Sequence, residues 1–446
     1  MVRLNFAHGS AEDHRSALMT AREAAGSLDR VVGGLADLPG PKMRTGPVPV
    51  GGVELRRGSV VVLTAQGPEA SPERIPTTVP DLASMVQPSE QILLSDGAIR
   101  ATVLRNLAGG EVEVRIERGG ILRSLKGIHL PASERRIEAF TADDRLAMDA
   151  AIGMGIDYVG VSFVRDADDL ERARSHARSR RSRAQIVAKI ETRSAVANLE
   201  EIVAVADVVM VARGDLGIQF PMRDVPFLQK RIIGLCNRRG RPVITATEML
   251  ESMTTSVRPT RAEVADVANA VLDGTDAVML SGETAIGDRP VEVVRAMHDI
   301  VLAADQEKTS RRATTEAMDA SVDDRVSWAI ARAAVQAAED LDVAAIVCPT
   351  RSGATAKRVA AFRPRMPILG IAHDPKLAGG LALYWGVTPA LVRFLPEERI
   401  GEEGVKRAAD AAAVSGLAAR GDLVAVVAGG PGPRAGSTDF VRIVRT

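Results

Sequence analysis

The chain is poor in cysteine and in aromatic residues, and it carries no excess of charge of either sign. Its two cysteines, Cys236 and Cys348, lie far apart in apolar surroundings, which favours buried thiols in a reducing compartment over a disulfide framework. Aromatic residues make up 3% of the chain, and its 57 basic residues equal its 57 acidic residues, so composition gives no support for a polyanionic partner. No apolar run is long enough to cross a membrane.

Local patterns also argue against a nucleic-acid or membrane partner. The segment 171–183 is rich in arginine but contains no aromatic side chain that would stack on bases, and we interpret it as a solvated helix face. The first residues, Met1–Phe6, carry no signal-peptide pattern. A cytoplasmic location is therefore expected.

The middle of the chain alternates apolar segments with helical patterns, and 446 residues suffice for two or three domains. The apolar segments are 157–163, 185–191, 207–213, 242–247 and 276–281, with two more at 2–6 and 31–38. Near-continuous apolar runs are typical of parallel strands buried on both faces. Polar residues gather at the ends of these runs, which predicts the active face of a (β/α)8 TIM-type barrel in an α/β protein. An open doubly wound sheet is the alternative.

Two flanking regions have a different character. Residues 46–127 consist of short alternating segments separated by turns, which predicts a small β-rich module with a hairpin turn at Asp96-Gly97. After residue 309, helical stretches at 326–341, 353–362 and 402–419 alternate with strands at 344–348, 368–372 and 423–427. The predicted division is thus 1–45 with 128–308 for the barrel, 46–127 for the inserted module and 309–446 for a C-terminal α/β domain.

One strand carries a cation and a carboxylate on the same face. Lys189 and Glu191 stand two positions apart in Ile186-Val-Ala-Lys-Ile-Glu191, and residues i and i+2 of a strand point the same way. Taken alone, the pair is equally well explained as a local ion pair. With Asp215 at the next strand end, however, two carboxylates suit Mg²⁺ or Mn²⁺. The turn at Arg213-Gly-Asp-Leu-Gly217 leads into a helix whose free N–H groups attract an anion.

A second anion site is predicted in the C-terminal region. Thr350-Arg-Ser-Gly-Ala-Thr355 opens a helix, and the hydroxyls of Thr350, Ser352 and Thr355 together with free N–H groups would form a phosphate pocket. Helix N-capping by itself explains part of this pattern.

The chain resembles pyruvate kinase in segments that run through nearly its whole length. These segments are Arg3-Leu-Asn-Phe-Ala-His-Gly9, Gly40-Pro41 to Arg44-Thr-Gly46, Lys126-Gly127, Lys189-Ile-Glu191, Met210-Val-Ala-Arg-Gly-Asp-Leu-Gly217, Ala246-Thr-Glu-Met-Leu-Glu-Ser252, Arg258-Pro-Thr-Arg-Ala-Glu263 and Met279-Leu-Ser-Gly-Glu-Thr284. The resemblance implies a barrel with an inserted β-barrel lid and a C-terminal effector domain. It also implies a cytoplasmic homotetramer that converts phosphoenolpyruvate and ADP to pyruvate and ATP in glycolysis.

The resemblance also implies a role for each matching residue. Lys189 would stabilise the phosphoryl group in flight, and Glu191 and Asp215 would hold the divalent metal. The substrate carboxylate would be taken by the backbone of Gly214 and Asp215 and by the hydroxyl of Thr247, on the side from which the enolate is protonated. Arg3 would clamp the phosphate. The nucleotide would lie against Asn5, His8, Arg44 and Lys126, and a phosphorylated effector against Thr350, Ser352 and Thr355. His8 is expected to be a structural histidine rather than a base, and Ser281 and Glu283 to be supports rather than reactants.

Several positions depart from the family pattern. The family has another strand and helix before the Arg3 strand, so the chain is expected to hold seven of the eight barrel strands, either because the true start lies upstream or because the protein is a degenerate relative. Ala7, Leu38, Lys42, His129 and Glu248 replace residues that are more usual there. Asn5 and Asp37 survive from the family's potassium site, but the ammonium of Lys42 would take the place of the ion. Potassium is therefore expected not to be required.

Two other functions fit parts of the pattern. A catalytically impaired relative that only binds a metabolite or partner is favoured by the missing strand, but the residues that carry the chemistry are intact. A metal-dependent enolate lyase or aldolase barrel also uses paired carboxylates, but it has no use for the lid, Lys126 or the C-terminal domain. The identity of the effector and the preferred nucleoside diphosphate are not determined by the sequence.

Overall fold

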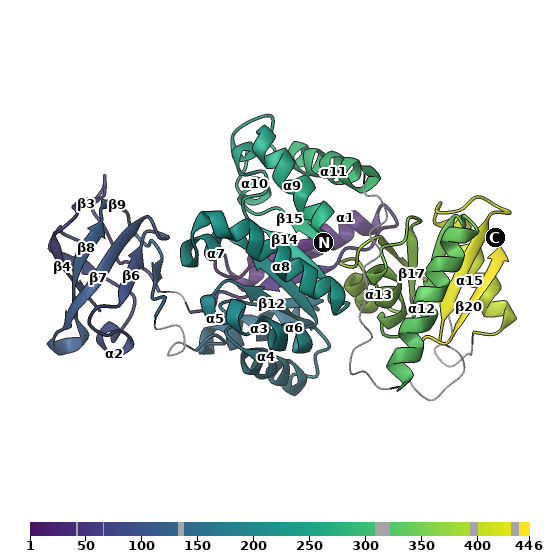
Figure 1. The fold of residues 1–446 in the computed structure, drawn as a ribbon, viewed down its shortest axis with the longest axis horizontal. Helices are drawn as coiled ribbons and strands as arrows, with labels where there is room; N and C mark the ends of the chain where they lie inside the picture. Colours follow the sequence, from purple (N-terminus) through teal and green to yellow (C-terminus); the bar gives the residue numbers. More distant parts are fainter. Residues whose placement is uncertain (42, 66, 133–137, 308–321, 393–399, 430–436) are drawn as a thin grey trace.

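The computed structural model describes residues 1–446 except 42, 66, 133–137, 308–321, 393–399 and 430–436. The described residues form three parts arranged in a row (Figure 1). A small β structure stands at one end, a parallel sheet surrounded by helices lies in the middle, and an α/β unit lies at the other end. The middle part therefore lies between the other two.

The middle part is built on a parallel sheet whose strands follow one another in chain order. Its seven strands are β1 (Val2–Asn5), β2 (Gly34–Asp37), β11 (Tyr158–Val161), β12 (Gln185–Ile190), β13 (Val208–Ala212), β14 (Val243–Ala246) and β15 (Ala277–Met279). Each pairs in parallel with the next. A doubly wound sheet reverses its strand order at a switch point, and this sheet has no reversal. The arrangement is therefore that of a TIM-type barrel, with β1 and β15 at the two edges of the described sheet.

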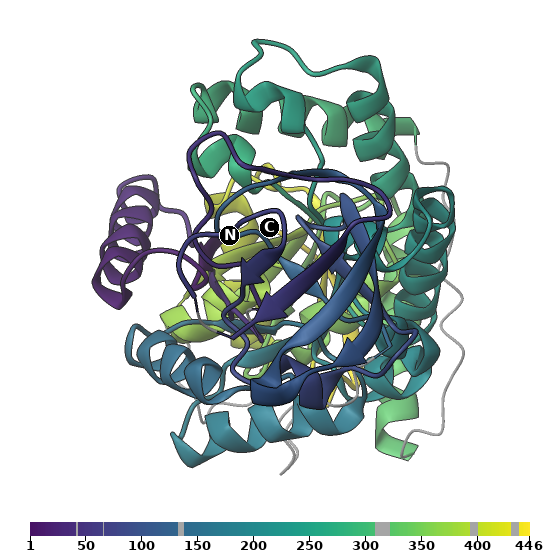
Figure 2. The same ribbon diagram turned by 90° about the vertical axis from the view of Figure 1, so that its left-hand side faces the viewer.

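Helices cover the outside of this sheet, and Figure 2 shows them around the strands in a view along the long axis. They are α1 (Ala11–Gly26), α3 (Ala142–Gly153), α4 (Ala167–Ser179), α5 (Arg193–Ala197), α6 (Leu199–Val205), α7 (Arg213–Gln219), α8 (Val225–Arg238), α9 (Arg261–Asp273), α10 (Gly282–Ala285) and α11 (Pro290–Glu307), with 3₁₀ turns at Met222–Asp224 and Glu251–Thr254. Capping boxes at Ser10 and Thr141 begin α1 and α3.

Strand alternation divides the side chains of the sheet between two layers. Ile186 and Ala188 of β12 belong to the core beneath the helices, whereas Val187 points to the opposite face. Lys189 is two positions after Val187 and therefore shares its direction. This alternation, which is visible in the sequence, carries the charged residues to the inside of the barrel.

The small β structure contains a six-stranded sheet and a separate strand pair. The sheet has the order β10 (Ile128–His129), β6 (Gln91–Leu94), β7 (Ile99–Asn106), β8 (Val112–Arg118), β4 (Val60–Thr64) and β5 (Arg74–Pro76), and the pair is β3 (Val53–Leu55) with β9 (Gly120–Leu122). A short helix α2 (Leu82–Met85) and a 3₁₀ turn at Ala108–Gly110 complete it. The predicted turn at Asp96-Gly97 is confirmed, since Leu94 pairs with Ile99 and both turn residues have positive φ.

The C-terminal part is a five-stranded sheet flanked by helices. Its strand order is β18 (Val387–Leu391), β17 (Ile368–Ala372), β16 (Ala345–Pro349), β19 (Leu423–Ala428) and β20 (Phe440–Arg445), and its helices are α12 (Val322–Asp340), α13 (Ala354–Ala361), α14 (Pro375–Leu381) and α15 (Glu402–Val414). Sequence analysis missed the two edge strands, and β18 contains a proline, which is typical of edges. The helix expected over 402–419 ends at Val414, because Gly416 adopts the left-handed conformation (φ 74°).

Buried contacts join the C-terminal part to the barrel. Tyr158 of β11 donates a hydrogen bond to the carbonyl of Gly380, and Arg363 pairs with Asp276 at 2.8 Å. Apolar residues of both parts, such as Val208 and Val359, belong to one core. Both cysteines are free and buried, as expected. Among the described residues, no helix is long and apolar enough to cross a membrane.

Candidate active site

Five polar side chains meet at the carboxyl ends of the first barrel strands. The Nζ atom of Lys189 lies 2.9 Å from Oδ1 of Asp37 and 2.9 Å from Oε1 of Glu191, and it donates a hydrogen bond of 2.7 Å to the hydroxyl of Ser162. The guanidinium of Arg3 contacts Oδ2 of Asp37 through Nε at 2.8 Å and Nη2 at 2.6 Å. The structure therefore brings Arg3, Lys189 and Glu191 together, and Asp37 is the link between the two cations.

A glycine on the intervening strand makes this meeting possible. Asp37 lies on β2 and Lys189 on β12, and β11 runs between them. Gly160 of β11 faces the space where they meet, since a Cβ atom there would lie 3.6 Å from both Oδ1 of Asp37 and Cδ of Lys189. A side chain that extended beyond Cβ at this position would occupy the gap. The contact across β11 thus depends on a small residue at position 160.

Burial and charge set the protonation of this cluster. Burial by itself would raise the pKa of Asp37, but Lys189 and Arg3 outweigh that effect and hold its pKa below the usual range. Burial would lower the pKa of Lys189, yet the charges of Asp37, Glu191 and Asp215 raise it well above its ordinary value. The cluster therefore presents a permanently charged ammonium group in a site with little water.

Two carboxylates remain as candidate metal ligands. Glu191 is buried and accepts the backbone N–H of Phe163 at Oε2, while Oε1 contacts only Lys189 among the described residues. Asp215 makes no hydrogen bond or ion pair within the described part of the chain. Burial raises the pKa of both carboxyl groups. The charge of Asp215 raises the pKa of Glu191 further, and the charges of Asp37 and Asp96 raise the pKa of Asp215. Two neighbouring carboxylates at the end of the barrel strands fit a hard divalent cation, although no group of three acidic, His or Cys side chains in the described chain surrounds one point.

Thr247 and Gly214 are joined directly. Thr247 follows β14 and Gly214 lies in the first turn of α7, and the Gly214 N–H donates a hydrogen bond of 2.8 Å to Oγ1 of Thr247. The same hydroxyl donates to the carbonyl of Ala246 at 2.7 Å. The Gly214 N–H is the group that was predicted to bind the substrate carboxylate. Here it donates to Thr247 instead, so a bound carboxylate would have to replace or share that hydrogen bond.

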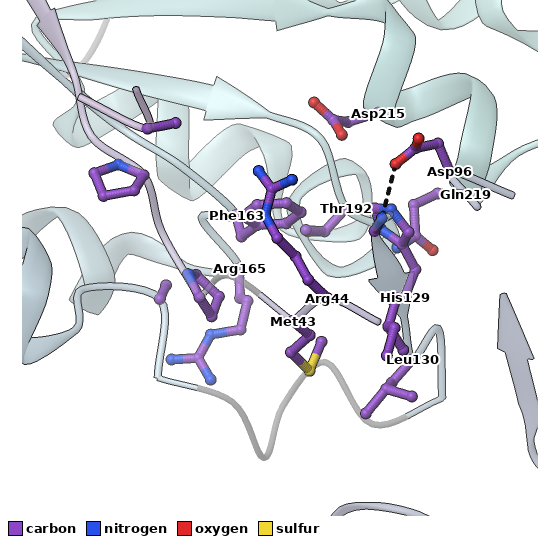
Figure 3. Close-up of a pocket in the computed structure, with 16 residues that line it drawn as sticks. Met43, Arg44, Asp96, His129, Leu130, Phe163, Arg165, Thr192, Asp215 and Gln219 are labelled. Carbon is purple, nitrogen blue, oxygen red and sulfur yellow. Dashed lines mark hydrogen bonds between the residues drawn. The ribbon is translucent and has the colours of Figure 1, made fainter. Parts of the chain in front are cut away.

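A cleft of about 190 Å³ lies between these strand ends and the small β structure. Figure 3 shows Arg44, Asp96, His129 and Asp215 around this cleft. Asp96 and His129 belong to the small β structure, and Asp215 belongs to α7 of the barrel. Its other lining residues are Ala7, Pro39, Pro41, Met43, Gly127, Ile128, Leu130, Ala139, Phe163, Arg165, Thr192 and Gln219. Because β10 and the Asp96 turn form one wall, the small β structure stands where a lid over the strand ends would stand.

The four residues expected to bind nucleotide are distributed along this region. Arg44 lines the cleft and donates to the carbonyl of Leu125 at 2.9 Å, and Lys126 lies 3.5 Å from Asp96. The side chain of Asn5 accepts the Ala7 N–H at 3.1 Å, whereas His8 is exposed. Only Arg44 of these four is among the residues that line the cleft. Lys42 lies outside the described residues.

Sequence analysis did not assign roles to Ser162, Asp96 or Arg213. Ser162 accepts from Lys189 and donates to the Leu38 carbonyl at 2.7 Å, and Asp96 accepts the Gly127 N–H at 3.2 Å. The sequence patterns around Ser162 and Asp96 do not indicate a functional site, because a serine after a strand and an Asp-Gly turn are both common. Glu283 is buried and accepts the N–H groups of Leu250 and Ser281, which agrees with a supporting role.

The predicted phosphate loop lies at the start of α13. The Thr350 hydroxyl accepts the Gly353 N–H at 2.9 Å, and the Thr355 hydroxyl is buried in a hydrogen bond of 2.9 Å with Thr438. Ser352 is exposed. Thr350 and Thr355 are thus engaged in local structure, as helix capping would require, and the effector site stays a prediction.

The fold and site define a class of enzyme: a TIM-type barrel that presents buried cations and carboxylates at its strand ends. The model for "Pyruvate kinase, barrel domain" matches residues 1–294, and that for "Pyruvate kinase, alpha/beta domain" matches residues 328–444. The chain is 41% identical to a pyruvate kinase of Geobacillus stearothermophilus over 99% of its own length and 75% of the relative. It is 38% identical to one of Mycobacterium intracellulare over 100% and 92%, and 40% identical to one of Thermococcus litoralis over 91% and 85%. The chain belongs to the pyruvate kinase family, the glycolytic phosphotransferases that act between phosphoenolpyruvate and pyruvate.

Proposed function

We propose that this chain transfers the phosphoryl group of phosphoenolpyruvate to ADP with a divalent cation, and that Lys189 is the residue on which the transfer depends. The observation that supports this most directly is the fixed position of the Lys189 ammonium, which contacts Asp37, Glu191 and Ser162 at 2.7–2.9 Å. A preorganised cation stabilises charge on a transferring phosphoryl group without reorganising during the reaction.

The neighbouring residues are proposed to hold the substrate in line with that cation. Arg3 and Lys189 contact the two oxygens of the same carboxylate, Asp37, so the two cations lie near one another and would bind one phosphate together. Thr247 and the backbone of Gly214 and Asp215 would hold the carboxylate, and Thr247 would lie on the face where the enolate takes its proton. Arg44 lines the cleft from the lid side, where it would neutralise nucleotide phosphates together with Asn5, His8 and Lys126. Positioning and charge neutralisation would supply most of the rate enhancement.

Glu191 and Asp215 are proposed to bind Mg²⁺ or Mn²⁺. Oε1 of Glu191 lies beside the Lys189 ammonium at 2.9 Å, and the oxygens of Asp215 accept no hydrogen bond within the described part of the chain. Substrate oxygens and water would complete the coordination of the cation. When bound, the cation supplies charge neutralisation to the phosphate and the developing enolate.

Potassium is proposed not to be needed. Both oxygens of Asp37 are engaged by Lys189 and Arg3, and the side-chain Oδ1 of Asn5 accepts the Ala7 N–H, so these two groups already have partners. Lys42 would add a tethered positive charge in the same region.

The remaining organisation is proposed from the same resemblance. Residues 1–45 and 128–308 would form the catalytic barrel, 46–127 the lid and 309–446 a domain that binds a phosphorylated effector through Thr350, Ser352 and Thr355. Because Ile128 and His129 of β10 pair with Leu94 and Leu93 of the small sheet, the lid side of this boundary would reach at least to the end of β10. A homotetramer in the cytoplasm is expected.

Purified protein with phosphoenolpyruvate, ADP and MgCl₂ tests the proposal by pyruvate formation coupled to NADH oxidation. ATP and pyruvate should appear in equal amounts, and omission of ADP or of the divalent cation should stop both. Binding of phosphoenolpyruvate without turnover would instead indicate a catalytically impaired relative. Cleavage of a carbon–carbon bond in a 2-oxo acid would indicate a lyase.

A further inference from the structure

A buried arginine holds the backbone on either side of Thr247. Arg213 is 7% exposed, and its guanidinium donates to three successive carbonyls at the end of β14. Nε lies 3.3 Å from the Ala246 oxygen and 3.2 Å from the Thr247 oxygen, while Nη2 lies 2.7 Å from the Thr247 oxygen and 3.1 Å from the Glu248 oxygen. One planar guanidinium group thus donates hydrogen bonds to three successive carbonyl oxygens of this turn.

This turn is conformationally unfavourable by itself. Thr247 has φ 67° and Glu248 has φ 53°, and neither residue is a glycine. The left-handed region is disfavoured for residues with a Cβ atom, and most of all for β-branched residues such as threonine. Two successive residues of this kind persist only where surrounding contacts over-determine them. The hydrogen bonds from Arg213 are such contacts, since carbonyls that rotated away would leave its buried donors without partners.

The arginine is itself held in place. Its Nη1 pairs with Oδ2 of Asp266 on α9 at 2.5 Å and lies 3.4 Å from Oε1 of Gln229 on α8. Its backbone begins α7, so the residue after it, Gly214, donates to the Thr247 hydroxyl. The side chain of Arg213 therefore binds the backbone of the Thr247 turn, and the N–H of the next residue, Gly214, binds the Thr247 hydroxyl.

We propose that Arg213 is a positioning residue for the reaction, which holds the Thr247 hydroxyl in the geometry needed at the face where the enolate is protonated. This inference rests on the proposed function, because it takes the role of Thr247 from there. Arg213 lies behind the turn and acts only through it. Lysine keeps the charge but cannot offer the fixed fork of donors that spans three carbonyls, so Arg213→Lys should let the turn relax.

The structural part of the proposal is tested without any assay of turnover. A crystal structure of Arg213→Lys should show Thr247 or Glu248 leaving the left-handed region. Unchanged φ angles at both residues would overturn the proposal. Asp266→Ala is the milder companion variant, because Asp266 is 40% exposed and its loss frees only one nitrogen of the guanidinium. If Arg213→Lys does not fold, the crystal structure of Asp266→Ala replaces it in this test. The same departure of Thr247 or Glu248 from the left-handed region is expected there.

The functional part is tested by a double-mutant cycle with Thr247→Ala. Pyruvate is incubated with Mg²⁺ and ATP in D₂O, and deuterium entry into its methyl group is followed by NMR, which reports the protonation step apart from net turnover. Arg213→Lys should slow this exchange about 100-fold in the wild-type background, the usual loss for a misplaced group. In the Thr247→Ala background the same substitution should cost less than about threefold, because residues that act as a unit are not additive.

The possible failures are distinguishable. Equal losses in both backgrounds would show that Arg213 does not act through Thr247 and would overturn this inference while leaving the proposed function intact. Wild-type exchange in Thr247→Ala would overturn it as well, together with the role given to Thr247. A wild-type protein that forms no pyruvate from phosphoenolpyruvate and ADP would refute the proposed function itself, and the crystal structure of Arg213→Lys would still decide whether the arginine holds the turn.

Discussion

The Nζ atom of Lys189 lies 2.9 Å from the carboxylate of Asp37, across a strand that has a glycine at the point of contact. Both side chains are almost fully buried. The ammonium group is therefore held in one place by opposite charge, and a phosphate that entered the site would meet a cation that needs no rearrangement.

Lys189→Met should lower turnover by about two to three orders of magnitude, the usual cost of removing one preorganised electrostatic contact. Mn²⁺ binding, measured by electron paramagnetic resonance, should remain, since Glu191 and Asp215 are unchanged. Lys230→Met is the matched control, because Lys230 is 53% exposed in its side chain and pairs with Asp273 outside the site. Near wild-type turnover in Lys189→Met would contradict the mechanism.

Arg363→Ala should lower the free energy of unfolding by about 3–5 kcal/mol, because it leaves the carboxylate of Asp276 buried without its cation. The two side chains are 7% and 6% exposed, and the pair joins the C-terminal part to the barrel. Urea denaturation measures the change. Arg407→Ala breaks an exposed pair with Glu403 on α15 and should lower the free energy of unfolding by less than about 0.5 kcal/mol. Equal losses in the two variants would show that the buried pair stabilises the protein no more than an exposed pair does.

Lys357 should make stability depend on pH in the alkaline range. Burial, with help from Arg241, lowers its pKa to about 8 from an ordinary 10.5, so the folded protein holds this proton less tightly than the unfolded chain does. Stability should therefore rise as the pH increases from about 8 towards 10.5. Lys357→Met removes this gain.

The difference in melting temperature between wild type and Lys357→Met, measured at pH 7 and pH 10, checks the sign. Between pH 7 and pH 10, the free energy of unfolding of the wild type should increase relative to that of the variant by roughly 2 kcal/mol. Lys406→Met on the exposed face of α15 serves as the control. A difference that stays constant between the two pH values would mean that Lys357 is as well solvated as the control lysine.

Full activity without potassium is the fourth expectation. Rates in tetramethylammonium buffer, with and without KCl at fixed ionic strength, should be equal for the wild type, because screening is then held constant. Lys42→Glu should be slower and should respond to KCl, since it removes the tethered charge. A large increase in the wild-type rate on adding KCl would refute the proposal.

Much of the fold was readable from the sequence. The barrel strands end within three residues of their predicted ends, because strands that are buried on both faces leave strong local patterns. The edge strands β18 and β20 were missed. They are half-exposed, and an edge strand is defined by its neighbour rather than by its own apolar pattern.

The sequence by itself determined that Lys189 and Glu191 share a face, because strand alternation is a local property of the backbone. It also identified the chemistry, through motifs that resemble one family. Only the tertiary structure showed that Asp37 joins Arg3 to Lys189, that Gly160 leaves room for this contact, and that Arg213 collects the carbonyls around Thr247. Those contacts connect residues on different strands. Their distances follow from strand order, register and backbone torsion angles, which the packing of the whole barrel decides and no local pattern records.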